Sequence, residues 1–575
     1  MTNGAFDDKP LESPSAREAR QADLSSILPP GRADWRLFWA LAVPVLIAAV
    51  LIFWDLGGPS FWGDEADCAL LARNILRFGL PVAYDGHYLI ETEKTIYAPG
   101  YLWNQHPWAA HYLCAASFAA FGESNFAARL PFALFSLCAV ALAGWIVFRI
   151  SRSPRAAFLA GLLLALNPQF LLFARQARYF PLLAPAGLLM LAGYLDLPRK
   201  RGVAVLLAGG FLFFHSNYVP FVPFMGALWL WALCAPGERK KLASLAVATG
   251  LVAALTVPWF FAVRAYERAA LVRTVDLGFI LTELKQYASL YNRFVAPAVL
   301  VPVAAWLAWR GSPYRRFYAL VLLVTAATVL FIIPVSIVRS LRYTVATIPL
   351  LAMAAALLFE ELFRSSKWLA AVLLLLALFT EVLSEAAILG SGLVRSALKG
   401  APLKDNVYLA QDLDTRFLKG DLADYVREMI WGFNLDPVAA TIDILKKEAK
   451  PTDLSVNTWS PKEVHYYTGL DTMCNISFEP PRGYQRPPDY PDDPSRYDRI
   501  WYMRRPPPYN IPKFDQYVLQ GLSDGRLRVT RWPFDYPNIQ AGNVPDLAVR
   551  EHRTAARLGR VRLYLIEKVS TGSSP

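Results

Sequence analysis

The chain has 575 residues, of which 55% are hydrophobic and 13% aromatic, and its formal net charge is +12. This composition is too apolar for an ordinary soluble enzyme, and many apolar runs approach the ~20 residues that span a bilayer. The basic residues lie in short clusters between apolar runs, as in cytoplasmic loops, so nucleic acid is not an expected partner. The sequence therefore predicts a polytopic α-helical membrane protein.

The first 33 residues are polar and rich in charge, proline and serine, and they contain no apolar core of a signal peptide. Such segments cannot bury enough apolar surface to fold. We therefore expect residues 1–33 to form a disordered cytoplasmic tail.

Apolar runs recur from residue 37 to residue 389 and predict about eleven membrane spans. These are placed at 37–56, 127–148, 156–174, 178–195, 202–216, 218–235, 242–263, 293–309, 317–335, 343–362 and 368–389. The loops expected on the inner side, such as "RISRSPR" and "GERKK", each carry two or three Lys or Arg. This pattern predicts a multi-pass protein of the plasma (inner) membrane, with a cytoplasmic N-terminus and a membrane domain over 34–392.

The apolar stretch 107–121 needs a separate interpretation, because counting it as a span would place every later basic loop outside. We interpret it as an interfacial helix. It then belongs to a long exterior loop, 57–126.

That loop contains two adjacent acids, Asp64 and Glu65, in the stretch "GDEADCALLARNILRFG" (63–79). The apolar residues of this stretch recur at helical spacing, with Asp64 near the N-cap and Gly79 as the stop signal. Helix capping needs only one acid, and a second carboxylate at the membrane boundary could serve as a base. The two interpretations are compatible.

Two arginine pairs lie at exterior span ends, where basic residues are uncommon. They are Arg175 with Arg178 in "FARQARYF" and Arg339 with Arg342 in "SIVRSLRYTVATIP". Such arginines either extend to lipid headgroups or nearby acids, or they hold a functional anion. Because guanidinium groups bind phosphate oxygens bidentately, a lipid phosphate or diphosphate is the expected anion.

The polar residues 393–575 form a separate region. Strand-like runs such as "DRIWYMRR" and "VRLYLIEK" alternate with helical runs such as "DPVAATIDILKKEAK". We expect a periplasmic or extracellular α/β domain. No glycine-rich phosphate loop follows any of its strands, so no nucleotide site is predicted there.

Four stretches taken together resemble the polyprenol-phosphate-sugar-dependent glycosyltransferases of C-type fold, which include protein O-mannosyltransferases and lipid A aminoarabinose transferases. They are "WGDEADCALLARNIL", "NQHPWAAHYL", "ARQARYFPLL" and "RYTVATIPLL". The resemblance covers about residues 35–390. It implies an inverting transfer of a sugar from a polyprenyl-phosphate donor to a hydroxyl of a lipid, glycan or protein at the exterior face.

The resemblance also implies residue roles. Asp64 matches the proposed general base, and Glu65 would assist it. Arg175 and Arg178, and Arg342 with Tyr343, match two stretches expected to hold the donor phosphate. His106 lies where relatives usually carry Lys-Pro-Pro or His-Pro-Pro, so either His106 or Lys94 would replace the missing lysine.

The chemistry requires a base on one side of the sugar and fixed positive charge at the leaving phosphate. No obligatory cofactor is expected, and a divalent metal remains open. A lipid or glycolipid transporter or flippase is the alternative function, although no pair of Gly/Pro-broken spans recurs in two halves. A non-catalytic scaffold is a third possibility. Membrane lipids are expected partners in each case.

Overall fold

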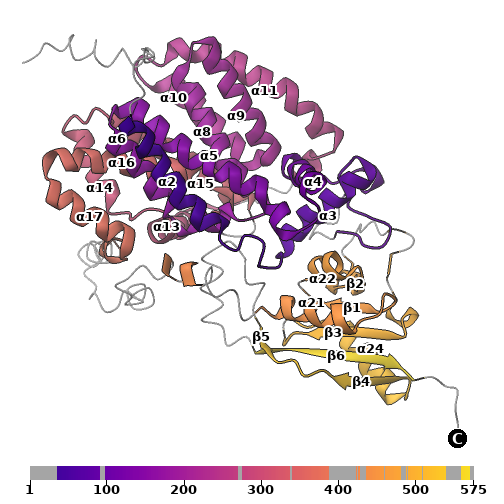
Figure 1. Ribbon diagram of the computed structural model, residues 1–575. Helices are drawn as coiled ribbons and strands as arrows, with labels where there is room; N and C mark the ends of the chain where they lie inside the picture. The colour runs from indigo at the N-terminus through magenta and orange to yellow at the C-terminus, as the bar shows by residue number, and fades with distance from the viewer. Residues whose placement is uncertain are drawn as a thin grey trace, which may run out of the picture.

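The computed structural model describes residues 35–90, 97–269, 275–336, 340–387, 422–423, 425–427, 436–458, 460–480, 487, 490–491, 493–507, 509–538 and 559–569. A bundle of apolar helices and a smaller α/β domain lie one above the other (Figure 1). The predicted tail 1–33 and the boundary near residue 392 fall outside the described residues.

The helical part follows the apolar runs of the sequence. Its helices are α2 (Trp35–Phe53), α3 (Gly63–Phe78), α4 (Ala109–Phe121), α5 (Asn125–Ser151), α6 (Pro154–Ala165), α7 (Pro168–Ala174), α8 (Phe180–Asp196), α9 (Lys200–Ser216), α10 (Tyr218–Cys234), α11 (Leu242–Ala262), α12 (Tyr266–Ala269), α13 (Leu277–Phe294), α14 (Leu300–Trp309), α15 (Arg315–Val335), α16 (Thr347–Ser365) and α17 (Lys367–Phe379). The short turns η1 (Pro99–Tyr101), η2 (Arg239–Lys241) and η3 (Leu341–Tyr343) connect some of them.

Four helices of the described chain are long and apolar enough to cross a membrane: α2, α5, α11 together with η2, and α15. A fifth is counted if α6 and α7, which meet at an angle of 68°, form one broken span. Helices α4, α8, α10, α14 and α17 are apolar but shorter. The predicted multi-pass helical architecture is confirmed, whereas the count of about eleven spans is not.

Three expected spans differ from the helices observed, and in each case local chemistry explains the difference. The segment 156–174 breaks because Asn167 caps a new helix that begins at Pro168. The segment 293–309 is interrupted: its first two residues end α13, and the helix resumes only at Leu300, because Pro297 lies in the connection between them. The segment 368–389 is continuous only to Phe379, where Thr380 turns extended.

Helix α3 begins two residues earlier than an N-cap at Asp64 would place it. Its N-cap is Trp62, with no side-chain cap, and Gly79 ends it at φ 79°. The expectation that Asp64 caps the helix was therefore wrong, and the end at Gly79 is confirmed. As the second residue of the helix, Asp64 has a side chain that is available for other contacts.

The C-terminal domain is an α/β domain, as predicted. Its sheet has the order β2-β1-β3-β6-β4, with β1 parallel to β2 and β3 and with β6 antiparallel to β3 and β4. The strands are β1 (Leu454–Asn457), β2 (Asp471–Met473), β3 (Arg499–Arg504), β4 (Leu527–Arg531), β5 (Tyr536–Pro537) and β6 (Arg560–Lys568); the helices are α21 (Pro437–Glu448), α22 (Pro461–Thr468), α23 (Asn475–Phe478) and α24 (Pro512–Ser523).

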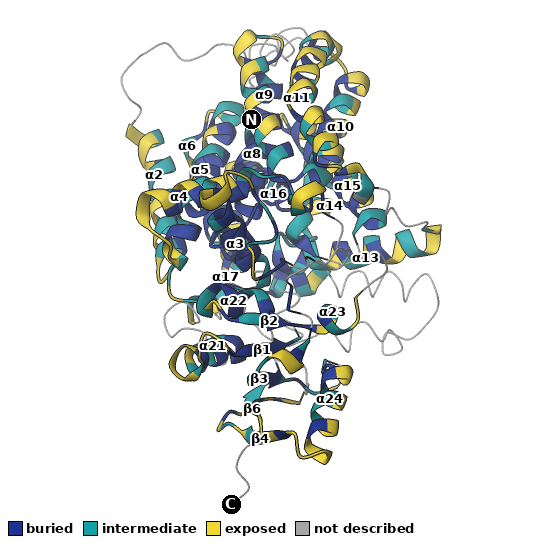
Figure 2. Cartoon of the chain, turned by 90° about the vertical axis from the view of Figure 1, so that its right-hand side faces the viewer, coloured by how far each residue is buried: buried dark blue, intermediate teal, exposed yellow. Residues whose placement is uncertain are grey.

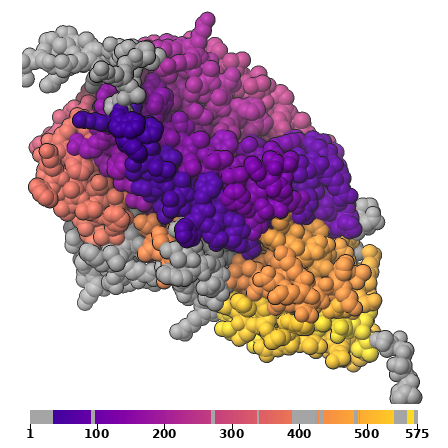
Figure 3. Space-filling view, in the orientation of Figure 1, coloured from indigo at the N-terminus to yellow at the C-terminus, as the bar shows by residue number. Residues whose placement is uncertain are grey.

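Helix α22 forms the edge of this domain that contacts the helical part. It lies next to α3, and the two parts form a continuous surface (Figures 1 and 3). Most of α3 is buried between the bundle and the α/β domain (Figure 2). The fold therefore holds the predicted acid pair at the junction of its two parts.

Candidate functional site

The start of α3 carries three carboxylates that face different surroundings, Asp64 and Glu65 in the first turn and Asp67 just after it. Asp64 is partly exposed, with 25% of its side chain accessible, whereas Glu65 and Asp67 are buried. Of the three, only Asp64 is therefore open to solvent and to a substrate.

Two predicted arginines lie beside the carboxylate of Asp64. Its Oδ2 is 3.6 Å from Nη2 of Arg178 and 3.7 Å from Nη1 of Arg342. Arg178 lies in the connection between α7 and α8, and Arg342 lies on η3, just before α16. The Nη1 group of Arg178 also donates to the main-chain carbonyl of Asp64 at 3.0 Å. The fold thus brings together three segments that the sequence separates widely.

These cations set the protonation state of Asp64. Burial by itself would raise the pKa of this carboxyl, but Arg178, Arg342 and Lys462 together hold the pKa below its usual value. Asp64 is therefore an anion at neutral pH, able to accept a proton or a hydrogen bond.

Glu65 has different surroundings from Asp64. Its two oxygens accept from Nε and Nη2 of Arg129, each at 2.7 Å, and both side chains are almost fully buried. Its Oε1 also accepts from the backbone N–H of Ala177 at 2.9 Å. Because these contacts occupy the carboxylate, they favour a structural role for Glu65 at the start of α3. Its expected role as an assisting base stays a prediction.

Arg175 is likewise placed away from the Asp64 cluster. Its guanidinium donates to three carbonyl oxygens at the end of α2, those of Leu51, Trp54 and Asp55. Cations stabilise the C-terminal end of a helix, where carbonyls lack partners. This geometry does not favour a phosphate contact by Arg175, whose expected role at the donor phosphate stays a prediction.

His106 and Tyr343 lie beside Arg178 and Arg342. The His106 ring stacks on Tyr179, with ring centroids 5.0 Å apart, and its Nδ1 is 3.4 Å from Nη2 of Arg178. The guanidinium of Arg342 lies 5.0 Å from the centre of the Tyr343 ring. Both residues therefore lie beside the two guanidinium groups, and their expected role at the donor phosphate stays a prediction. The other two candidates, Lys94 and Arg339, fall outside the described residues.

Sequence reasoning missed two residues of the site. Asp67 binds Lys462 of α22, whose Nζ lies 2.8 Å from Oδ1, and its Oδ2 is 4.0 Å from Nη1 of Arg178. The spacing of Asp64 and Asp67, three residues apart on a helix, indicates that they share a face. No sequence pattern indicates that Lys462, which lies 395 residues after Asp67, would reach them.

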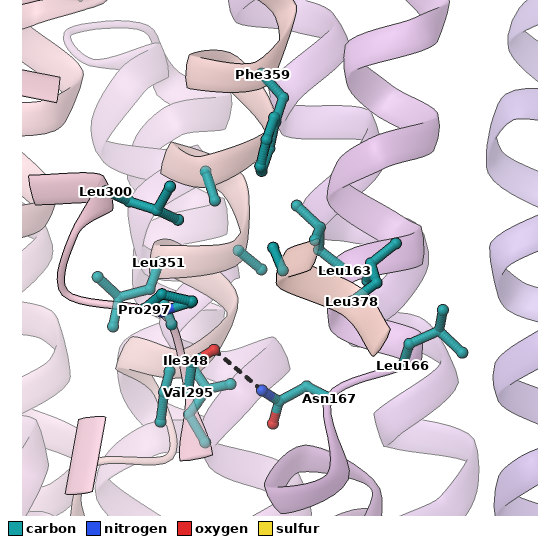
Figure 4. A pocket seen from close by; sticks show the side chains of 14 residues that line it. Leu163, Leu166, Asn167, Val295, Pro297, Leu300, Ile348, Leu351, Phe359 and Leu378 are labelled. Atoms are coloured by element: carbon teal, nitrogen blue, oxygen red, sulfur yellow. Dashed lines mark hydrogen bonds between the residues drawn. The ribbon is translucent and has the colours of Figure 1, made fainter. Parts of the chain in front are cut away.

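An apolar pocket lies at the break between α6 and α7 (Figure 4). Leu163 of α6 lines the pocket. Side chains of α16, α17 and the connection before α14 complete its wall, including Val295, Ile348, Leu351 and Leu378. The Asn167 amide donates to the Val295 carbonyl at 3.2 Å and so ties the break to this connection. An apolar lining of this kind is suited to contact a hydrocarbon chain.

No group of three or more His, Cys, Asp or Glu side chains with the geometry of a metal site occurs among the residues that the structure describes. The expectation of no obligatory cofactor remains a prediction.

No protein-family model and no curated protein sequence matches the chain. The fold, however, matches the crystal structure of ArnT from Cupriavidus metallidurans bound to undecaprenyl phosphate. The TM-score is 0.54 at 15% identity, over 95% of this chain and all of that chain. The apo structure of the same protein gives a TM-score of 0.51 at 16% identity, over 94% of this chain and 99% of that chain.

ArnT is a lipid-phosphate-dependent glycosyltransferase of C-type fold. The likeness extends over both parts of the chain and confirms the fold that the four sequence stretches predict. The protein described here is therefore a multi-pass membrane protein with the C-type glycosyltransferase fold.

Proposed function

We propose that this protein is an inverting glycosyltransferase. It would move a sugar from a polyprenyl-phosphate donor to a hydroxyl of a lipid, glycan or protein acceptor at the exterior face of the plasma (inner) membrane. The observation that carries the proposal is the Asp64 carboxylate with Arg178 and Arg342 on either side. The fold of ArnT, whose structure holds undecaprenyl phosphate, supports the class of donor.

The two arginines suit the donor phosphate. Both lie more than 3.5 Å from the Asp64 oxygen, which is longer than the ~2.7–2.9 Å of a tight charge-assisted hydrogen bond. A move of either guanidinium toward a phosphate oxygen therefore breaks no tight pair with the Asp64 carboxylate. His106 and Tyr343 lie beside the two guanidinium groups and would line the same phosphate subsite.

Asp64 is suited to act as the general base for the acceptor hydroxyl. As the acceptor hydroxyl attacks the anomeric carbon, its proton passes to Asp64, and the bond from that carbon to the phosphate oxygen breaks with its electron pair on the phosphate. Attack from the side opposite the phosphate inverts the configuration. The arginines stabilise the charge that develops on the leaving phosphate.

The same charges couple donor binding to the strength of the base. While the donor is absent, Arg178 and Arg342 depress the pKa of Asp64. A bound phosphate would neutralise part of their charge, so the carboxylate would become more basic when the donor is in place. This favours proton removal in the loaded enzyme.

Localisation and partners follow from the reaction. A cytoplasmic N-terminus and an exterior C-terminal domain would place Asp64 with a donor presented at the outer leaflet. No nucleic acid and no obligatory metal enter the proposal; a divalent metal is tested by adding a chelator to the assay.

The variant Asp64→Asn tests the assignment. We expect turnover to fall by roughly 10²–10⁴-fold, since the general base is lost while size and shape are kept. The assay measures transfer of labelled sugar from a panel of undecaprenyl-phosphate sugars to membrane lipids, glycans and proteins. Glu123→Gln is the matched control, because Glu123 is an exposed acid paired with Arg73 in the same loop. Turnover of Asp64→Asn above about a tenth of wild type would contradict the role.

A further inference from the structure

We propose that the C-terminal domain is a working part of the site, in which Lys462 holds Asp67 and thereby keeps Arg178 directed toward Asp64 and the donor phosphate. The proposal rests on the proposed function and assigns Lys462 as a positioning residue. It makes catalysis depend on the docking of the α/β domain.

The contact between Lys462 and Asp67 is close and shielded. The Lys462 Nζ lies 2.8 Å from Oδ1 and 2.9 Å from Oδ2 of Asp67. Asp67 is 3% exposed. A buried carboxylate without a cation is strongly disfavoured, so Asp67 needs a cationic partner to stay charged.

Arg178 is the other cation within reach of Asp67. Its Nη1 lies 4.0 Å from Asp67 and its Nη2 lies 3.6 Å from Asp64, so this guanidinium stands between two carboxylates of one helix face. In addition, the buried Nε of Arg178 has no hydrogen-bond partner among the described residues. Without Lys462, we expect Arg178 to turn toward Asp67 and away from the phosphate subsite.

The position of Lys462 on its helix supports a role at Asp67. Pro461 is the first residue of α22 and Lys462 the second, so the ammonium group lies at the positive end of the helix dipole. A cation is unfavourable there, and the contact with Asp67 offsets this cost. At the second position of a helix, a residue without such a partner would more often be neutral or acidic.

Several contacts hold α22 against the first exterior loop. The Tyr467 hydroxyl accepts from the Phe61 backbone N–H at 2.8 Å and donates to Asn125 at 2.7 Å. His465 Nε2 lies 3.0 Å from Asp85 Oδ2. These contacts, made by the same short helix, fix the position of Lys462 relative to α3.

The test compares Lys462→Met with the double variant Lys462→Met/Asp67→Asn. We expect the single variant to lower turnover by roughly 10²-fold and to weaken binding of undecaprenyl phosphate, because a misplaced charged group near the chemistry has effects of this size. The double variant should recover most of both properties, since the neutral amide that replaces the Asp67 carboxylate no longer attracts Arg178. If the pair of Lys462 and Asp67 were merely structural, the double variant would be as impaired as the single variant, because both lack the ion pair.

Lys513→Met is the matched control, since Lys513 lies on α24 of the same domain and pairs with the exposed Glu479. Elution as a single species and an unchanged melting temperature exclude misfolding. Wild-type behaviour of Lys462→Met, or a double variant as impaired as the single, would overturn the inference while leaving the proposed function intact. A wild type that neither binds undecaprenyl phosphate nor transfers sugar would instead remove the proposed function and this inference with it.

Discussion

The buried pair of Glu65 and Arg129 separates structural from chemical roles within the acid motif. We predict that Glu65→Gln lowers the stability of the protein strongly, whereas Asp64→Asn, one residue away, lowers turnover with little effect on stability. Glu65 is 0% and Arg129 2% exposed, and two hydrogen bonds of 2.7 Å join them.

The magnitude follows from what the substitution leaves behind. Gln keeps the shape and can accept one hydrogen bond, but the buried guanidinium loses its counter-ion. Breaking a buried ion pair on one side typically costs about 3–5 kcal/mol. Arg129 retains the carbonyls of Leu56 and Pro59, both at 2.9 Å, so we expect a loss near the lower end, ~3 kcal/mol.

Thermal unfolding in detergent, followed by tryptophan fluorescence, measures this effect. Glu123→Gln again serves as the control, because its partner Arg73 is partly exposed and such a pair contributes about 0–1 kcal/mol. Glu65→Gln should also lower turnover, since Oε1 holds the Ala177 N–H next to Arg178. A melting temperature equal to wild type, together with lost turnover, would refute the structural assignment and restore Glu65 as a chemical group.

Three further predictions concern the phosphate site, the domain junction and the topology. Arg178→Lys should weaken binding of undecaprenyl phosphate, whereas Arg175→Lys should lower the melting temperature and leave that affinity unchanged; the reverse pattern would exchange their roles. Burial raises the pKa of Glu463 from 4.5 to about 8. The folded state therefore keeps a proton that the unfolded state loses, so the stability of the protein falls as pH rises from about 4.5 to about 8. The variant Glu463→Gln should flatten this decline. An equal slope of stability against pH in both proteins would contradict the prediction. Ser523 and Ser365 are both exposed, so each can carry a cysteine probe in a background without other exposed cysteines. A thiol reagent that cannot cross the membrane, applied to intact cells, should modify Ser523→Cys and spare Ser365→Cys. The opposite labelling would mean that the membrane orientation of the protein is inverted.

The sequence by itself determined the class of fold and identified the residues at the centre of the candidate site. Long apolar runs and basic loops leave few alternatives to a membrane bundle, because backbone groups in a bilayer must pair within helices. The acid motif at Asp64 and the arginines near Arg178 and Arg342 stood out because charge at a membrane boundary is costly. Strand periodicity likewise identified the α/β domain.

The tertiary structure alone decided which member of each motif faces the site. Asp64 and Glu65 are adjacent in sequence, but successive helix positions point in different directions, so one carboxylate reaches Arg178 and the other is buried on Arg129. In the same way, Arg175 turns to the end of α2 while Arg178 turns to α3. Lys462 could not be predicted, because its contact with Asp67 depends on how the two parts of the structure dock, and docking leaves no periodic pattern in either segment.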